Sequence, residues 1–128
     1  NILVVKYYQC HFQLIQAIHC IPRHFKGFSS AAAIRLSHSG NHLFVSNRGH
    51  DSIAMYRVNK ESGKISLLYM VHTKKDPRDF QIVDDRYLII ACQGSNLLQV
   101  MTFNEDTEEL VLSDSSIEIP APVCVAFE

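Results

Sequence analysis

The stretch NHLFVSNRGHDSIAMYRVNKESGKI (Asn41 to Ile65) decides the fold, because the chain repeats its pattern as RYLIIACQGSNLLQVMTFNEDTEEL (Arg86 to Leu110). Apolar runs, loops and the polar turn match at one constant offset, which places Val45 on Ile90. A period of about 40–50 residues filled with short strands is typical of β-propeller blades. The sequence therefore predicts an all-β fold built from four-stranded antiparallel blades.

The repeat also sets the blade boundaries. Residues 31–73 and 77–119 are each predicted to form one full blade, residues 1–21 the outer half of a preceding blade, and residues 122–128 the inner strand of a following one. A propeller closes its ring with about 4–8 blades. We therefore expect this to be about two and a half blades of a ring, and the parent protein to be several times longer.

Composition narrows the classes of partner. The chain is 47% hydrophobic and 20% charged, with a formal net charge of −1, which argues against nucleic acid or an anionic membrane as a partner. No apolar run approaches the roughly 20 residues of a membrane span. The seven histidines and four cysteines show no metal-ligand spacing, so we expect no metal site.

Loop positions divide the charges between the two faces of the predicted disc. In an antiparallel blade, the first and third turns share one face, and the middle loop and the connection to the next blade share the other. The turns of the first face are short, polar and mostly acidic. The second face collects Arg48, His50, Asp51, His72, Lys74, Lys75 and Arg78. This gathering of cationic groups near the channel predicts a site for an anionic small molecule.

Structural roles compete with this interpretation. Lys74 and Lys75 fit solvated loop positions, and Arg78 fits a structural arginine paired with Asp79 or Asp84. Arg48 stands apart, because the repeat places the uncharged Gln93 at its position in the next blade. A loop that replaces a neutral residue with Arg-Gly-His-Asp indicates specialisation of one blade.

Three segments resemble the lactonase family of seven-bladed propellers. They are SNRGHDSI (Ser46 to Ile53), PRDF (Pro77 to Phe80) and PVCVAF (Pro122 to Phe127). That family includes propeller-type 6-phosphogluconolactonases and resembles the fungal 3-carboxymuconate lactonising enzymes. The similarity runs from about Phe12 to Glu128, and it implies the C-terminal third of a seven-bladed ring.

The resemblance implies a cytoplasmic enzyme without a cofactor that hydrolyses a sugar-acid lactone such as 6-phosphogluconolactone. Its substrate would be a small anionic lactone or sugar acid. A muconate-type lactonising or cycloisomerase activity is the alternative within the family. Further polar residues of such a site would lie in earlier blades, so the remaining blades, from the same protein or another chain, are expected partners.

The same motif suggests site residues. Arg48 matches an arginine regarded as part of the active site in the muconate-lactonising relatives, and it could stabilise an oxyanion. His50 is the candidate general base or acid. Asn47, Asp51, Lys75 and Arg78 are the candidate substrate-binding residues.

Two other classes of function remain open at this point. A non-catalytic ligand- or protein-binding propeller would be favoured if Arg48 were paired by salt bridges and closed off from solvent. A structural remnant of two blades would expose apolar faces and associate with itself.

Overall fold

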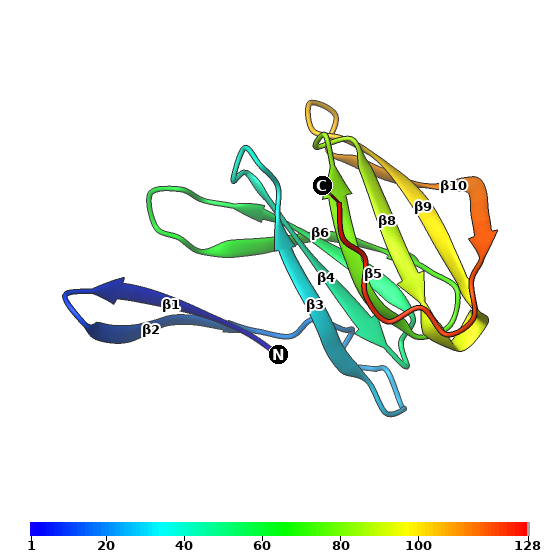
Figure 1. Ribbon diagram of the computed structural model, residues 1–128. Coiled ribbons are helices and arrows are strands. Elements are labelled where there is room, and N and C mark those ends of the chain that lie inside the picture. The colour runs from blue at the N-terminus through cyan, green and yellow to red at the C-terminus, as the bar shows by residue number, and fades with distance from the viewer. Residues whose placement is uncertain (128) are drawn as a thin grey trace.

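A computed structural model describes residues 1–127 and contains three antiparallel sheets that lie side by side (Figure 1). The first is the hairpin of β1 (Ile2–Tyr8) and β2 (His11–Ile18). The middle sheet contains β3 (Ser30–Leu36), β4 (His42–Arg48), β5 (Ser52–Val58) and β6 (Ile65–His72). The last contains β7 (Pro77–Val83), β8 (Tyr87–Cys92), β9 (Leu97–Asn104) and β10 (Glu109–Glu118), with the short 3₁₀ helix η1 (Gln93–Ser95) between β8 and β9. The predicted all-β architecture of four-stranded antiparallel sheets is confirmed.

Each four-stranded sheet is a simple meander in which sequence neighbours pair. In the middle sheet, Phe44 pairs with Met55 and Val45 with Ala54 across β4 and β5. The residues at the centre of β4 are buried whichever way they point, which explains why this strand is apolar without alternation. Gly40 adopts φ +76° in the β3–β4 turn, a conformation that glycine reaches without strain.

One apolar layer joins the two four-stranded sheets. Phe44, Ile53 and Met55 of the middle sheet pack against side chains of the last sheet, among them Phe80, Leu88, Ile90, Met101 and Phe103. The rings of Phe44 and Phe103 meet edge to face with centroids 5.1 Å apart. Edge-to-face pairs are favoured by the ring quadrupoles. This contact therefore fixes how the two sheets lie relative to one another, and it also buries part of their facing surfaces.

The opposite face of the middle sheet packs on the β1–β2 hairpin. Ile2 and Cys20 bury against Val45, Ala54 and Tyr56. The tip of the hairpin extends away from the rest of the molecule (Figure 1). Apolar side chains on its outer face are exposed, including Leu3, Val5, Tyr7, Phe12 and Leu14.

The apolar alternation in the sequence AAIRLS (Ala32 to Ser37) predicts that Ile34 and Leu36 of the inner strand β3 point into a core, and the structure differs from this prediction. They are 48% and 53% exposed. Ile34 lies opposite Val45, and Leu36 opposite Leu43, so both point to the side of the middle sheet that carries β1 and β2. That two-stranded hairpin covers the outer part of the face and leaves the inner part open.

The expected inner strand at 122–128 is not a strand within the described residues. Residues 122–127 pair with no neighbouring strand, and Glu128 lies outside the described residues. An inner blade strand is held by the second strand of its own blade, and residues 1–127 provide no such partner for this segment. The segment is nevertheless fixed, because the Val125 N–H donates to Asp79 Oδ2 at 3.0 Å in the neighbouring strand β7.

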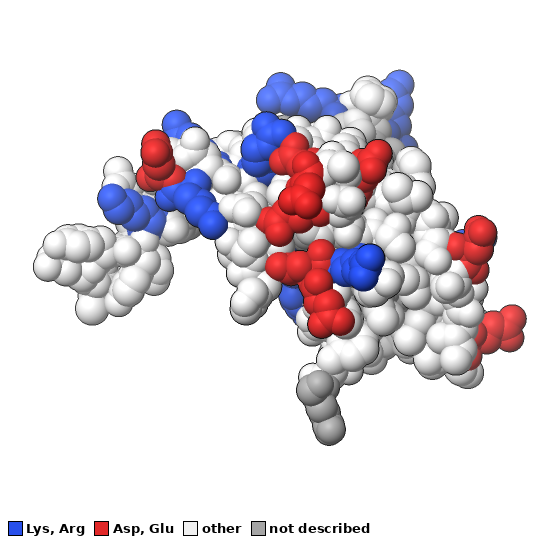
Figure 2. Space-filling view, turned by 90° about the horizontal axis from the view of Figure 1, so that it is seen from above, with Lys and Arg blue, Asp and Glu red and all other residues white. Residues whose placement is uncertain are grey.

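The turns between β3 and β4, β5 and β6, β7 and β8, and β9 and β10 share one end of the sheets. Seen from above in Figure 2, acidic side chains gather near the middle of this end. Glu108 contacts His42 at 2.9 Å and also pairs with Arg57, while Glu105 accepts from Asn41 at 2.8 Å. These acids of the last sheet therefore bind the middle sheet.

No helix within residues 1–127 is long and apolar enough to cross a membrane.

At the opposite end, the loop between β4 and β5 turns at Gly49. Its φ is +87°, and a Cβ built there would lie 2.1 Å from the carbonyl oxygen of Phe28. Backbone strain and a backbone clash both require glycine at this position. Gly49 thus allows the segment before β3 to pass directly beside this loop.

Replacing this glycine provides a test of that close approach. We expect Gly49→Ala to lower the free energy of unfolding by more than Gly40→Ala, which is the matched control. Both positions have positive φ and share a conformational cost of about 1–2 kcal/mol, but a Cβ at Gly40 would meet nothing nearer than 3.8 Å. Urea denaturation of the two variants measures the difference, and equal losses would contradict the predicted clash.

Candidate functional site

Two loops form the candidate site at the end opposite the acidic turns. One is the β4–β5 loop, which follows Arg48 at the end of β4. The other joins β6 to β7 and carries Lys75 and Asp76. The meander places both loops at the same end of the sheets, so residues of two successive blades meet there.

Arg48 stands between two adjoining pockets. The first, of about 370 Å³, is called here the arginine pocket and is lined by Ala32, Ala33, Arg35, Arg48, Arg78, Asp79 and Val123. The second, of about 380 Å³, is called the loop pocket and is lined by Phe28, Ser30, Arg48, Gly49, Asp51, Lys75 and Asp76. Three guanidinium groups and one carboxylate line the arginine pocket, so it favours an anionic ligand.

Arg48 forms a two-pronged ion pair with Asp76. Its Nε donates to Asp76 Oδ1 at 2.6 Å, and its Nη2 donates to Oδ2 at 3.3 Å. The hydrogen bond from Arg48 is the main cause that lowers the pKa of Asp76, and the same bond raises the pKa of Arg48. Both groups therefore remain charged across the physiological range.

The ion pair does not close Arg48 off from solvent. Its side chain is 34% exposed, and within residues 1–127 its Nη1 has no hydrogen-bond partner. A purely structural role would be favoured if Arg48 were paired by a salt bridge and closed off from solvent. The salt bridge is present, but the side chain is not closed off. The free end of the guanidinium is available to a ligand.

Lys75 and Arg78 are exposed at this end of the sheets. Lys75 is held through its backbone, since its N–H donates to Ser95 Oγ at 2.8 Å. Arg78 donates to the neutral amide oxygen of Gln93 at 3.2 Å. Neither cation forms an ion pair with the described part of the chain, so both add positive charge beside Arg48.

His50 lies on the same loop as Arg48, but its ring lines neither pocket. The ring packs edge to face on Phe25 and stacks on His72 with centroids 5.1 Å apart, and Nδ1 lies 2.8 Å from Ser52 Oγ. Burial is the main cause that lowers the pKa of His50, and the neighbouring His72 lowers it further. His50 is therefore a neutral imidazole at pH 7.

Two expected substrate-binding residues are engaged elsewhere. The Asn47 side chain is fully buried and donates to the Cys20 carbonyl at 2.8 Å, so it holds the chain beyond β2 and does not reach either pocket. Asp51 lines the loop pocket, but its Oδ1 accepts the N–H groups of Gly49 and Asp76 at 3.1 and 2.9 Å.

Arg35 is a site residue that the sequence reasoning missed. It pairs with Asp79 at 2.9 Å and lines the arginine pocket. The expected pairing of Arg78 with Asp79 or Asp84 is thus wrong for Asp79, because Arg35 takes that partner. The signal was present in the sequence, since a lone charge lies in an inner strand between Ile34 and Leu36.

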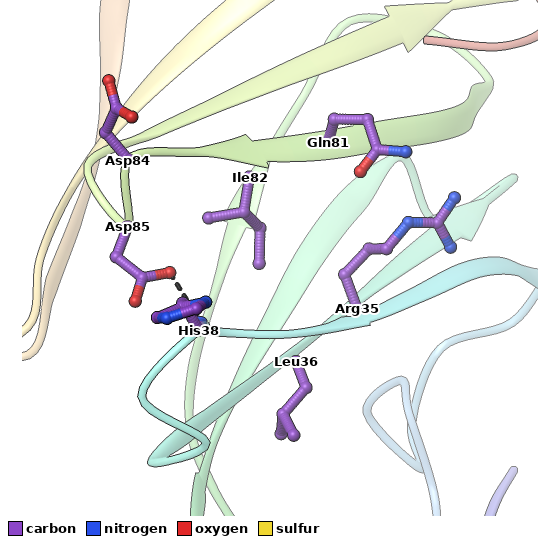
Figure 3. Close-up of a pocket in the computed structure, with 7 residues that line it drawn as sticks. All are labelled: Arg35, Leu36, His38, Gln81, Ile82, Asp84 and Asp85. Carbon is purple, nitrogen blue, oxygen red and sulfur yellow. Dashed lines mark hydrogen bonds between the residues drawn. The ribbon is translucent and has the colours of Figure 1, made fainter. Parts of the chain in front are cut away.

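A hollow larger than either of these pockets lies elsewhere, between β3 and β7 toward the acidic turns (Figure 3). It measures about 540 Å³ and is lined by Arg35, Leu36, His38, Gln81, Ile82, Asp84 and Asp85. Asp85 is occupied by the turn, because it accepts the His38 and Ser39 N–H groups at 2.7 and 3.1 Å. Two aspartates and one arginine line this hollow, whereas three arginines and one aspartate line the arginine pocket. An anion is therefore expected to bind more favourably in the arginine pocket.

No group of three histidine, cysteine, aspartate or glutamate side chains is placed to hold a metal ion in the described part of the chain. The charged groups that line the two pockets are the cations Arg35, Arg48, Lys75 and Arg78 and the carboxylates Asp51, Asp76 and Asp79.

Comparisons with known proteins agree with this architecture. The chain is 40% identical to an uncharacterized protein of Staphylococcus saprophyticus, over 96% of this chain and 36% of that protein. It is 35% identical to a 6-phosphogluconolactonase of Bacillus subtilis, over 91% of this chain and 34% of the enzyme. The chain thus spans about a third of the length of these relatives.

The structure superposes on a Pseudomonas aeruginosa periplasmic gluconolactonase with a TM-score of 0.90 and 25% identity. The match covers 95% of this chain and 35% of that one. The family described as "Lactonase, 7-bladed beta-propeller" matches residues 1–127. On these grounds the chain belongs to the lactonase family of seven-bladed β-propellers.

Proposed function

We propose that the protein carrying this chain hydrolyses a sugar-acid lactone, with 6-phosphogluconolactone as the first substrate to test. The observation that carries the proposal is Arg48, charged and half-exposed between two pockets, with its Nη1 end free. The similarity to the Bacillus subtilis 6-phosphogluconolactonase supports the choice of substrate.

The proposed reaction needs stabilisation of one developing negative charge. Water attacks the lactone carbonyl, a C–O bond forms, and the carbonyl oxygen becomes an oxyanion. Arg48 Nη1 donates to that oxygen, a role suited to a group that stays protonated. The ring C–O bond then breaks, and the ring oxygen takes up a proton to become a hydroxyl.

Two further cations would hold the substrate. Arg78 and Lys75 flank Arg48 without carboxylate partners among residues 1–127. A phosphate or carboxylate on the substrate would offset their charge. Arg48 would then act at the reacting carbonyl while Arg78 and Lys75 fix the distant end.

His50 is proposed as the group that accepts the proton of the attacking water. Its lowered pKa keeps the imidazole neutral and therefore able to accept a proton at neutral pH. The ring extends from the β4–β5 loop, part of which lines the loop pocket, and it lies outside the lining of both pockets.

Further blades are proposed to complete the walls of the site. The chain spans about a third of its relatives, and a ring needs about 4–8 blades. We also propose a cytoplasmic location. The Pseudomonas aeruginosa relative is named periplasmic, so membership of the family leaves the compartment to be measured by cell fractionation.

The role of Arg48 is tested in protein expressed from the complete gene. We expect Arg48→Ala to lower kcat for 6-phosphogluconolactone by about 100- to 1000-fold, the usual loss for one oxyanion donor. Arg57→Ala is the matched control, since Arg57 is also paired with a carboxylate but lies at the acidic end. A kcat in Arg48→Ala within about threefold of the parental value would refute the assignment. Absence of lactone hydrolysis by the parental protein would favour a binding role.

The role of His50 predicts a pH profile. Because the pKa of His50 is lowered, protonation should reduce kcat only below about pH 6.5, and the rate should level off above it. His50→Gln should remove this acid limb. His72→Asn should move the limb to higher pH, since His72 helps to lower the pKa of His50. An unchanged limb in His50→Gln would exclude His50 as the proton acceptor.

A further inference from the structure

The Arg48–Asp76 pair joins two blades, and Asp76 has an unusual backbone conformation. Arg48 ends β4 of the middle sheet, and Asp76 directly precedes β7 of the next. Asp76 has φ +64°, in the left-handed region that aspartate and asparagine tolerate better than most residues. The carboxylate is thereby turned to face the guanidinium across the blade boundary.

Asp51 holds that conformation in place. Its Oδ1 accepts the backbone N–H of Asp76 at 2.9 Å and that of Gly49 at 3.1 Å. Its own carbonyl accepts from the Thr73 N–H at 2.9 Å and lies 3.1 Å from His72 Nδ1. One residue of the β4–β5 loop thus binds the β6–β7 loop at two points, Thr73 and Asp76, and also contacts His72 at the end of β6.

We propose that Asp51 and Asp76 are positioning residues that act through Arg48. Asp51 fixes the backbone of Asp76, and the Asp76 carboxylate then occupies the Nε and Nη2 side of Arg48. This leaves the Nη1 end directed at a ligand. Asp51 is in this view a positioning residue and not the substrate-binding residue that the sequence suggested. The inference rests on the proposed function.

The arrangement also assigns different tasks to the cations. Asp76 already occupies the Nε and Nη2 side of Arg48, which is a side that can bind a carboxylate in a bidentate manner. Arg78 has only a neutral amide as partner. The anionic group of the substrate therefore belongs with Arg78, and the reacting carbonyl with Arg48.

A double-mutant cycle tests the dependence on Arg48. In protein from the complete gene, Asp76→Asn should lower kcat for 6-phosphogluconolactone by about 10- to 100-fold, as expected for a misplaced catalytic group, with KM changed less than twofold. Asparagine keeps the left-handed backbone, which limits any loss of folding. In an Arg48→Ala background, the same change should alter kcat less than twofold.

Equal losses of kcat in both backgrounds would show that Asp76 acts independently of Arg48. That result would overturn the positioning role of Asp51 and Asp76 but not the proposed function. An unchanged kcat in Asp76→Asn would also overturn the positioning role. If the parental protein does not hydrolyse 6-phosphogluconolactone at all, the proposed function fails instead, so the two failures are distinguishable.

Asp51 offers a matched pair of variants. Asparagine and glycine both tolerate its φ of +53°, but only asparagine retains an oxygen that can accept the two N–H groups. We expect Asp51→Asn to keep kcat within about threefold and Asp51→Gly to lose about tenfold or more. Parental kcat in Asp51→Gly, in protein with an unchanged melting temperature, would contradict the role.

An NMR measurement decides the positioning without relying on turnover. The Nε–H proton of Arg48 should exchange with water more slowly than that of the exposed Arg86, because Asp76 accepts it. Asp51→Gly should speed this exchange, and Asp51→Asn should not. If the Arg48 Nε–H proton of the parental protein exchanges as fast as that of Arg86, the positioning role is overturned, even if no lactone is hydrolysed.

Discussion

The apolar layer between the two four-stranded sheets is the contact on which the site depends. Phe44 and Met55 of the middle sheet, with Phe80 and Phe103 of the last, bury the facing surfaces of both. Burial of this kind contributes about 25 cal/mol per Å² of apolar surface. Side chains of both sheets meet in this layer, so it sets the distance between the two blades. Because Arg48 ends a strand of one blade and Asp76 precedes a strand of the next, the layer also sets the distance between these two residues.

Polar contacts at the two ends of the blades serve different purposes. At the acidic end, Glu105 and Glu108 bind His42, Asn41 and Arg57 across the blade boundary. At the opposite end, cations exceed carboxylates around the arginine pocket. The same meander places these turns at one end and the loops around Arg48 at the other, where a ligand can approach.

Much of the fold was predictable because it depends on local periodicity. The repeat predicts strands at 42–47, 52–58 and 65–71, and the structure has β4 and β6 one residue longer and β5 with the same bounds. The polar turns lie where these strands end. Ile34 and Leu36 were misjudged, because alternation along a strand does not tell which face of a sheet is covered. Residues 122–127 likewise carry a strand pattern without a strand partner among the described residues.

By itself, the sequence determined the blade repeat, the loop that carries Arg48 and the excess of cations at that end, because these follow from the order of residues along the chain. Only the tertiary structure decided which charges meet. Arg48 pairs with Asp76, 28 residues away, and Arg35 with Asp79, 44 residues away. It also turned Asn47 into the protein and His50 out of both pockets. Such choices depend on how two blades pack, and side-chain directions at the end of a strand are set by that packing.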